Sequence, residues 1–305
     1  MEPPLVESVR LGDVRFDIRH RALVMGVLNR TTDSFYDKGS YYSFDAFLAK
    51  ADELVTDGAD LLDVGGVKAG PGVEVGLEEE LDRVVPAVEA LTSRFDLPLS
   101  VDTWRAAVLE AACTAGAVVG NDISGFADPA YLGVAAATGA SVVATHMRLQ
   151  PRVADPHPEY DHLVDDVRSF LSDRAQRAIA AGIPADRVIV DAGLDLGKTW
   201  SQSIELLRSS AALADLGFPL LLSASNKAFI GGLLDLEVAD RRMASHAAHA
   251  IGIVGGCRMI RVHDVKGARR TVDVLAAILG ARHTEAPNAA EPAEPTEYAA
   301  RVSAA

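Results

Sequence analysis

The sequence predicts an α/β protein of the (β/α)8 TIM-barrel class, because short apolar runs alternate with helical stretches along most of its length. Eight such runs occur, over residues 22–30, 59–66, 97–103, 117–125, 141–146, 187–193, 219–225 and 258–264. Each run carries a polar residue at or near its C-terminal end. In a barrel of parallel strands the active site gathers at those ends. The same pattern therefore predicts the fold and the functional face.

The segments outside the eight runs predict three parts of the chain. Val9–Ile18 alternates around a Gly-Asp pair, which predicts a hairpin below the barrel, so residues 1–20 form an N-terminal extension and hairpin. Residues 21–282 form the barrel domain, with its first helix beginning near Ser43. Residues 283–305 are rich in Pro, Glu and Ala, and we predict a disordered tail there.

Glycines mark the ends of several predicted helices. Gly58, Gly116, Gly139 and Gly256 are each followed by a small residue and then by the next strand. Because Gly tolerates the left-handed conformation that ends a helix, these positions predict a repeated helix-to-strand junction.

Composition narrows the classes of partner. A chain of 305 residues with 49% hydrophobic residues is long enough for one barrel-sized domain. Its two cysteines, Cys113 and Cys257, lie in apolar surroundings and predict buried free thiols in a reducing cytoplasm. No apolar run is long enough to span a membrane. The net charge of −14 argues against nucleic acid and anionic membranes as partners.

Three polar residues that end strands predict a binding pocket. Asp102, Asn121 and Asp191 each follow a strand that is expected to be buried on both faces. A buried carboxylate needs hydrogen-bond donors, and the ring edge of an NH-rich heterocycle supplies several in one plane. The alternative for each residue is an internal hydrogen bond or a helix N-cap.

Positive residues and an amide are expected on the same rim. Lys227, Arg261 and His263 lie at the ends of the last two strands, where barrels commonly bind phosphate. Asn29, at the end of the first strand, is a candidate Mg2+ ligand if a substrate phosphate supplies other oxygens. The alternative for Asn29 is a turn capped by its side chain and by Asp33 and Asp37.

Two further patterns are interpreted as structural. Gly193–Thr199 resembles a phosphate-binding P-loop but has three residues between its glycines where that motif requires four. We interpret it as the loop after the sixth strand. His246 and His249, three apart on a helix, have no accompanying ligand cluster, so we expect them at a surface or a subunit interface rather than at a metal.

The chain resembles the dihydropteroate synthases. MGVLNRTTDSFYDKG, SVDTWRAAV, GNDISG, DAGLDLGK, SASNKAFIGGLL and MIRVHDV occur in the family's order, and the resemblance covers residues 9–280. That family is a homodimeric barrel which joins 6-hydroxymethyl-7,8-dihydropterin pyrophosphate to p-aminobenzoate.

The resemblance implies roles for individual residues. The pterin pocket would comprise Asp102, Asn121, Asp191 and Lys227, and the pyrophosphate with Mg2+ would be held by Asn29, Arg261 and His263. The catalytic residues would be Asp102, Lys227, Arg261 and His263.

The departures from the family pattern concentrate around the second substrate. The usual G-G-E-S-T-R-P-G loop reads Gly65-Gly66-Val67-Lys68-Ala69-Gly70-Pro71-Gly72, so a Thr and an Arg are replaced by Ala69 and Gly70. After the seventh strand S-R-K-S becomes Ser225-Asn226-Lys227-Ala228, and the first loop has Arg30-Thr31-Thr32 for V-T-P. The chain thus resembles the divergent second paralogue of actinomycetes, whose members are regarded as lacking ordinary synthase activity.

These features lead to one functional hypothesis and two alternatives. The hypothesis is a homodimeric, cytoplasmic homologue that binds the pterin pyrophosphate with Mg2+ and condenses p-aminobenzoate weakly or not at all. One alternative is an active pterin transferase, either an ordinary synthase or one that uses another nucleophile recruited by Arg30, Lys68 and Arg148. The other alternative is a non-catalytic regulator of a true synthase.

Overall fold

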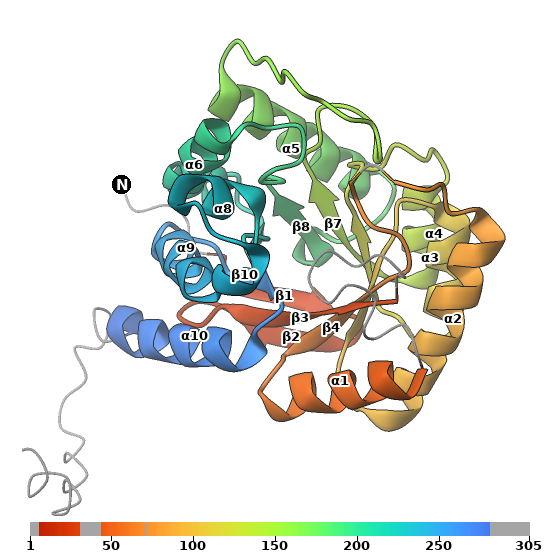
Figure 1. The fold of residues 1–305 in the computed structure, drawn as a ribbon. Helices are drawn as coiled ribbons and strands as arrows, with labels where there is room; N and C mark the ends of the chain where they lie inside the picture. Colours follow the sequence, from red (N-terminus) through yellow and green to blue (C-terminus); the bar gives the residue numbers. More distant parts are fainter. Residues whose placement is uncertain (1–5, 31–43, 71, 281–305) are drawn as a thin grey trace, which may run out of the picture.

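The computed structural model describes residues 6–30, 44–70 and 72–280, which form a closed barrel of parallel strands surrounded by helices (Figure 1). The order around the barrel is β10-β3-β4-β5-β6-β7-β8-β9. The barrel strands are β3 Leu23–Asn29, β4 Leu61–Gly65, β5 Leu99–Asp102, β6 Val119–Asp122, β7 Ser141–Thr145, β8 Val188–Asp191, β9 Leu220–Leu222 and β10 Met259–Val262. The predicted TIM barrel is therefore confirmed, and each strand lies within its predicted apolar run.

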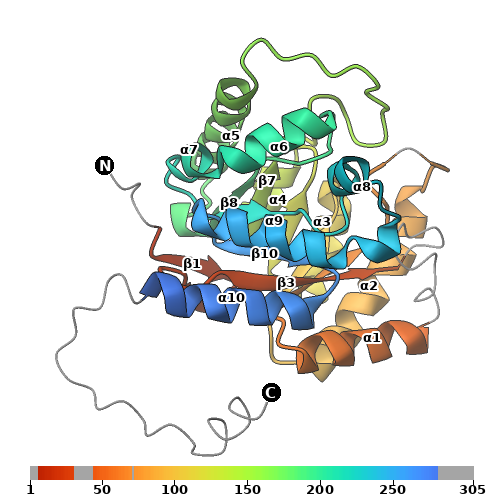
Figure 2. The same cartoon turned by 60° about the vertical axis from the view of Figure 1, so that its left-hand side comes forward.

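Helices follow each barrel strand and cover the outside of the ring (Figures 1 and 2). They are α1 Phe44–Thr56, α2 Leu77–Arg94, α3 Ala106–Thr114, α4 Tyr131–Thr138, α5 Leu163–Ala180, α6 Trp200–Arg208, α7 Ser210–Ala214, α8 Ala228–Leu234, α9 Arg242–Val254 and α10 Val265–Gly280. Short 3-10 turns occupy Ala185–Arg187 and Val238–Asp240. Gly58, Gly116, Gly139 and Gly256 all have positive φ angles, so the expected helix-to-strand junction is present.

A hairpin closes one end of the barrel. β1 Ser8–Leu11 pairs antiparallel with β2 Val14–Asp17, as predicted. Val9, Leu11 and Ile18 are almost completely buried and belong to the cluster of apolar side chains that fills the barrel interior. The barrel residues of this cluster are Leu23, Met25, Leu61, Val119, Val143, Ile189, Leu221 and Met259. The N-terminal end of the barrel is thus a packed apolar floor.

The polar residues of the rim follow from the alternation of side chains along each strand. Residues two apart point the same way, so the next inward position after each floor residue lies one layer higher. That next position is polar after six of the floor residues. Asp63 follows Leu61, Asn121 follows Val119, Thr145 follows Val143, Asp191 follows Ile189, Ser223 follows Leu221, and Arg261 follows Met259. A polar layer therefore rests directly on the apolar floor.

Some predictions lie outside the described residues or need correction. The predicted disordered tail 283–305 and the first loop, with Asp33 and Asp37, lie outside them. Both cysteines are free, and Cys257 is buried as expected, but Cys113 is partly exposed. Within the described part of the chain, no helix has both the length and the apolarity to cross a membrane.

The expectation for the histidines of α9 is wrong for His249. This side chain is fully buried within the chain, whereas His246 is partly buried and its Nε2 lies 3.0 Å from Asp264 Oδ2. Neither ring nitrogen of His249 has a hydrogen-bond partner. α9 buries this side chain against its own barrel, so His249 belongs to the interior and not to a subunit surface.

The burial of His249 predicts a loss of stability in mild acid. Burial, followed by repulsion from His246, lowers the pKa of His249 to about 3. The unfolded chain protonates this group near pH 6.5, so its effect is absent above that pH and grows as the pH falls toward 3. At about pH 5.5 the penalty is about 1.4 kcal/mol. His249→Leu should therefore gain that much over wild type between about pH 7.5 and pH 5.5 in urea unfolding.

His157→Leu is the matched control because His157 is exposed in the loop after β7. Its unfolding free energies should run parallel to wild type across the same pH range. Parallel curves for His249→Leu as well would contradict the expected role of His249.

Candidate active site

The four residues predicted to form the pterin pocket lie together at the C-terminal end of the barrel. Asp102 ends β5 and is in register with Asn121 on the neighbouring β6. Asp191 ends β8, and Lys227 follows β9, the next strand around the barrel. Lys227 is close enough to Asp191 to favour the charged form of its carboxylate. The structure therefore brings these side chains to one rim.

A buried ion-pair network connects the rim across the barrel. Arg261 donates from Nε to Asp63 Oδ2 at 2.6 Å and from Nη2 to Asp102 Oδ2 at 2.8 Å. Asp63 is completely buried and also accepts from Ser100 Oγ at 2.6 Å and from Asn121 Nδ2 at 3.2 Å. Asp63 thus links residues from β4, β5, β6 and β10.

Asp63 is the functional residue that sequence reasoning missed. It lies within the apolar run 59–66, but the sequence pattern alone assigns it no role. Two signals identify it. Asp63 lies two residues after Leu61, so its side chain points into the barrel as that of Leu61 does. The Arg261 side chain also points inward and pairs with it.

Internal hydrogen bonding, the alternative considered for the pocket residues, is present for each of them. Asp102 pairs with Arg261 through Oδ2, Asn121 donates to Asp63 through Nδ2, and Asp191 Oδ1 accepts from the Gly193 amide at 2.8 Å. Each of these bonds engages one terminal atom of the side chain. The remaining atoms are Asp102 Oδ1, Asn121 Oδ1 and Asp191 Oδ2, which are all acceptors.

Burial makes ionisation costly for both pocket carboxyl groups. It raises the pKa of Asp102 to about 7, with Arg261 opposing the shift and Asp63 adding to it. Burial also raises the pKa of Asp191, while the Gly193 amide and Lys227 oppose it. Carboxyl groups of this kind gain most from a ligand that donates hydrogen bonds to them.

The expected cluster of three positive charges needs correction at His263. Burial, and then repulsion from Arg261 and Lys227, lowers the pKa of His263 to about 3, so its imidazole is neutral near pH 7. Its Nδ1 lies 3.0 Å from Ser225 Oγ. Lys227 and Arg261 carry the positive charge of this part of the rim, and Arg261 shares its charge with two carboxylates.

Asn29 ends β3 and lies close to Asp102 on the rim. A Cβ added to Gly65 would lie 3.1 Å from Asn29 Oδ1 and 3.7 Å from Asp102 Oδ2, so both oxygens lie beside this glycine. In the described residues no group of three or more His, Cys, Asp or Glu is placed to hold a metal. This donor set suits Mg2+ only if a bound phosphate supplies further oxygens.

Lys198 is a second residue whose role the sequence did not reveal. Its Nζ donates to the carbonyl oxygens of His146, Gly193 and Leu196 at 3.2, 2.9 and 3.0 Å, and lies 2.9 Å from His146 Nδ1. Burial lowers the pKa of Lys198 to about 7. The lysine of the P-loop-like motif therefore ties the loop after β8 to the residue after β7, consistent with our interpretation of that motif as a loop.

The loop that departs most from the family pattern is held by the loop after β7. Arg152 Nη1 donates to the Lys68 carbonyl at 3.0 Å, and the Arg152 amide donates to the Ala69 carbonyl at 3.1 Å. Arg152 Nη2 bonds the Val73 carbonyl. A Cβ added to Gly70 would meet no described atom within 4 Å, so this position has space for a Cβ atom.

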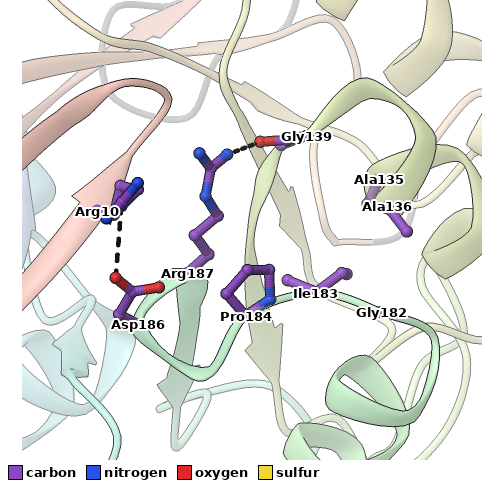
Figure 3. Close-up of a pocket in the computed structure, with 10 residues that line it drawn as sticks. Arg10, Ala135, Ala136, Gly139, Gly182, Ile183, Pro184, Asp186 and Arg187 are labelled. Atoms are coloured by element: carbon purple, nitrogen blue, oxygen red, sulfur yellow. Dashed lines mark hydrogen bonds and ion pairs between the residues drawn. The ribbon is translucent and has the colours of Figure 1, made fainter.

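A separate cavity of about 430 Å³ lies at the opposite end of the barrel, near the hairpin (Figure 3). Its two arginines are engaged: Arg10 Nε lies 3.4 Å from Asp186 Oδ2, and Arg187 bonds the Gly139 carbonyl. This cavity contains none of the predicted site residues, so we assign the functional site to the C-terminal rim.

Comparison with known proteins agrees with this geometry. The sequence signature of a family described as "Pterin binding enzyme" matches residues 25–263. "Inactive dihydropteroate synthase 2" of Mycobacterium leprae is 44% identical over 268 residues, covering 86% of this chain and 92% of that protein. The dihydropteroate synthase of Bacillus subtilis is 38% identical over 263 residues, covering 86% and 90%.

Solved structures give the same result. A Yersinia pestis dihydropteroate synthase in a sulfonamide drug complex has a TM-score of 0.86 and 39% identity, covering 90% of this chain and 99% of that one. The Xanthomonas albilineans enzyme with 4-aminobenzoic acid has a TM-score of 0.82 and 36% identity, covering 89% and 98%. The chain therefore belongs to the pterin-binding enzyme family and is a homologue of the dihydropteroate synthases.

Proposed function

We propose that this protein binds 6-hydroxymethyl-7,8-dihydropterin pyrophosphate together with Mg2+, and that it condenses this substrate with p-aminobenzoate weakly or not at all. The observation that carries the proposal is the set of acceptors on the rim, Asp102 Oδ1, Asn121 Oδ1 and Asp191 Oδ2, beside Lys227. A pterin ring edge carries several N–H donors in one plane and is complementary to such a set.

The pyrophosphate would be held on the β10 side of the rim. The two ion pairs of Arg261 use Nε and Nη2, so Nη1 is the nitrogen that remains for a phosphate oxygen. His263 would contribute a hydrogen bond and not a charge, because its pKa is lowered to about 3. Mg2+, bound by Asn29 and phosphate oxygens, would supply charge stabilisation for the departing pyrophosphate.

The proposed reaction needs three contributions from the protein. The C–O bond to pyrophosphate breaks, an arylamine nitrogen forms the new bond to that carbon, and the amine then loses a proton. The protein has to stabilise the leaving group, hold the pterin and orient the amine. Residues of the rim would meet the first two of these needs. Orientation of the amine is the third, and Ala69, Gly70 and Ala228 lack the side chains that would serve it.

The relatives are consistent with either activity state. The mycobacterial relatives carry the name "Inactive dihydropteroate synthase 2", whereas the Bacillus subtilis relative is named dihydropteroate synthase. The higher identity is to the mycobacterial protein, which supports weak condensation. Transfer of the pterin methylene to another amine is the second candidate, because the pterin side of the rim retains its residues while the amine side does not.

We also propose a cytoplasmic homodimer assembled through the helices that follow the sixth to eighth barrel strands, α6 to α10. α9 and α10 pack side by side (Figure 2). Both helices leave large apolar side chains exposed. Met243, Ile251 and Val254 of α9 are 78%, 57% and 60% exposed, and Val274 of α10 is 59% exposed. An apolar face of this kind is typical of contact with a second copy.

Asp191→Asn should weaken dihydropterin binding. The change replaces an acceptor by an amide that can present N–H groups to the N–H groups of the ring, which costs about 2–3 kcal/mol. Calorimetric titration of dihydropterin pyrophosphate with Mg2+ measures the change. Asp165→Asn on the exposed face of α5 is the charge-matched control and should bind as wild type. Equal affinity for Asp191→Asn, or no binding to wild type, would refute the proposed pterin site.

Condensation with p-aminobenzoate should be at least about a hundredfold slower than in an ordinary synthase, on the order of 3 kcal/mol in barrier. The combined variant Ala69→Thr, Gly70→Arg and Ala228→Ser should recover more activity than any single change, because the three side chains serve one pocket. A coupled pyrophosphate-release assay at saturating substrates measures both. Wild-type turnover equal to an ordinary synthase would show that the altered loops still orient the amine.

Light scattering at micromolar concentration should report a dimer. Ile251→Asp combined with Val254→Asp should convert it to a monomer, because two buried charges would enter the interface without partners. Val153→Asp is the control, since Val153 is 54% exposed in the loop after β7, away from α9. A monomeric wild type, or a dimer that survives the double change, would place the interface elsewhere.

A further inference from the structure

One carboxylate is fixed beside the altered second-substrate corner. Asp195, in the loop after β8, accepts through Oδ2 from the amides of Ala228 and Phe229 at 2.5 and 3.3 Å. Its Oδ1 accepts from Ser203 Oγ at 3.1 Å, and its own amide donates to the same hydroxyl at 3.1 Å. The side chain is therefore tied to α6 on one side and to the start of α8 on the other.

Asp195 has a backbone conformation that few residue types adopt easily. Its φ of +64° lies in the left-handed region, which is unfavourable for most residues other than Gly and is tolerated best by Asn and Asp. The hydrogen bonds of the carboxylate hold the residue in this conformation. Gly193 and Gly197, on either side, also have positive φ angles. The loop thus turns sharply and presents the Asp195 side chain to the segment that follows Lys227.

The position of this carboxylate bears directly on the second substrate. Ala228, whose amide it binds, is one of the three positions where the family's second-substrate pocket is altered. The residue before Ala228 is Lys227, whose side chain we assign to the pterin pocket. A carboxylate is therefore held at the altered corner, against the residue that follows Lys227.

One cation of the neighbouring loop after β7 is already neutralised. Arg148 is one of the residues that the sequence analysis named as recruiting another nucleophile. It forms a bidentate ion pair with Asp155, from Nε to Oδ2 at 2.6 Å and from Nη2 to Oδ1 at 2.7 Å. Both loops pack together here, since Tyr160 Oη donates to the Gly197 carbonyl at 2.7 Å. The charge of Arg148 does not offset that of Asp195.

We propose that Asp195 is a specificity-determining residue that excludes carboxylate-bearing amines, so that the acceptor of the pterin methylene is an uncharged or cationic amine. This inference rests on the proposed pterin site and names the class of its second substrate. Like charges in a partly buried site repel strongly, so a second carboxylate is disfavoured beside the first. The same charge attracts, or at least tolerates, an amine that has no carboxylate.

The test compares p-aminobenzoate with p-aminobenzamide, which has nearly the same shape but no charge. Both are titrated calorimetrically into wild-type protein, with and without saturating dihydropterin pyrophosphate and Mg2+. Wild type should bind p-aminobenzamide at least about tenfold more tightly than p-aminobenzoate. Asp195→Asn, which removes the charge but keeps an acceptor for the Ala228 amide and suits a positive φ, should bring the ratio close to one.

Two further variants separate charge from structure. Ser203→Ala loosens Asp195 but keeps its charge, so the wild-type preference should remain. Asp195→Gly removes the carboxylate at a φ that Gly adopts easily, and it should lose the preference as Asp195→Asn does. Thermal melting of each variant confirms that it is folded.

Each outcome decides the proposal. An unchanged ratio in Asp195→Asn and Asp195→Gly, a wild-type preference for p-aminobenzoate, or no binding of either amine to any variant would overturn the role of Asp195. Failure of the pterin itself to bind in the first titration would instead overturn the proposed function, and the ratio measured without pterin would still report on Asp195.

Discussion

The rest of the site depends on one buried charge, the carboxylate of Asp63. A carboxylate in the interior of a barrel is costly unless it is fully hydrogen-bonded and paired. Asp63 meets both conditions through Arg261, Ser100 and Asn121. In doing so it fixes the guanidinium of Arg261 and turns the amide of Asn121 so that its oxygen is the remaining acceptor. The orientation of the Arg261 and Asn121 side chains therefore follows from their pairing with the buried charge of Asp63.

The fold was predictable from the sequence because each strand is short, apolar and followed by a helical stretch. The repeated pattern left few alternatives to a barrel. Side chains two residues apart on a strand point the same way, so Leu61 lies in the apolar floor and Asp63 in the polar layer above it. The location of Asp102, Asn121, Asp191 and Lys227 on one rim follows from the same regularity. These features depend on periodicity, which a single sequence contains in full.

Pairings between distant side chains were not predictable in this way. The sequence does not show that Arg261 meets Asp63, that Lys198 points back to three carbonyl oxygens, or that Asp195 reaches the amide of Ala228. The pairs of Arg261 with Asp63 and of Asp195 with Ala228 join segments that lie far apart along the chain. Lys198 binds two carbonyl oxygens of its own loop and also reaches the distant His146. The neutral state of His263 and the burial of His249 were missed for the same reason, since both follow from what surrounds the ring.

The hairpin formed by β1 and β2 closes the end of the barrel below the proposed pocket. Because Val9, Leu11 and Ile18 complete the apolar floor, a molecule held by the polar layer would exchange through the rim. A second molecule that binds above it would block its exit. Two molecules stacked at this site would therefore exchange in a fixed order, with the deeper one entering first and leaving last.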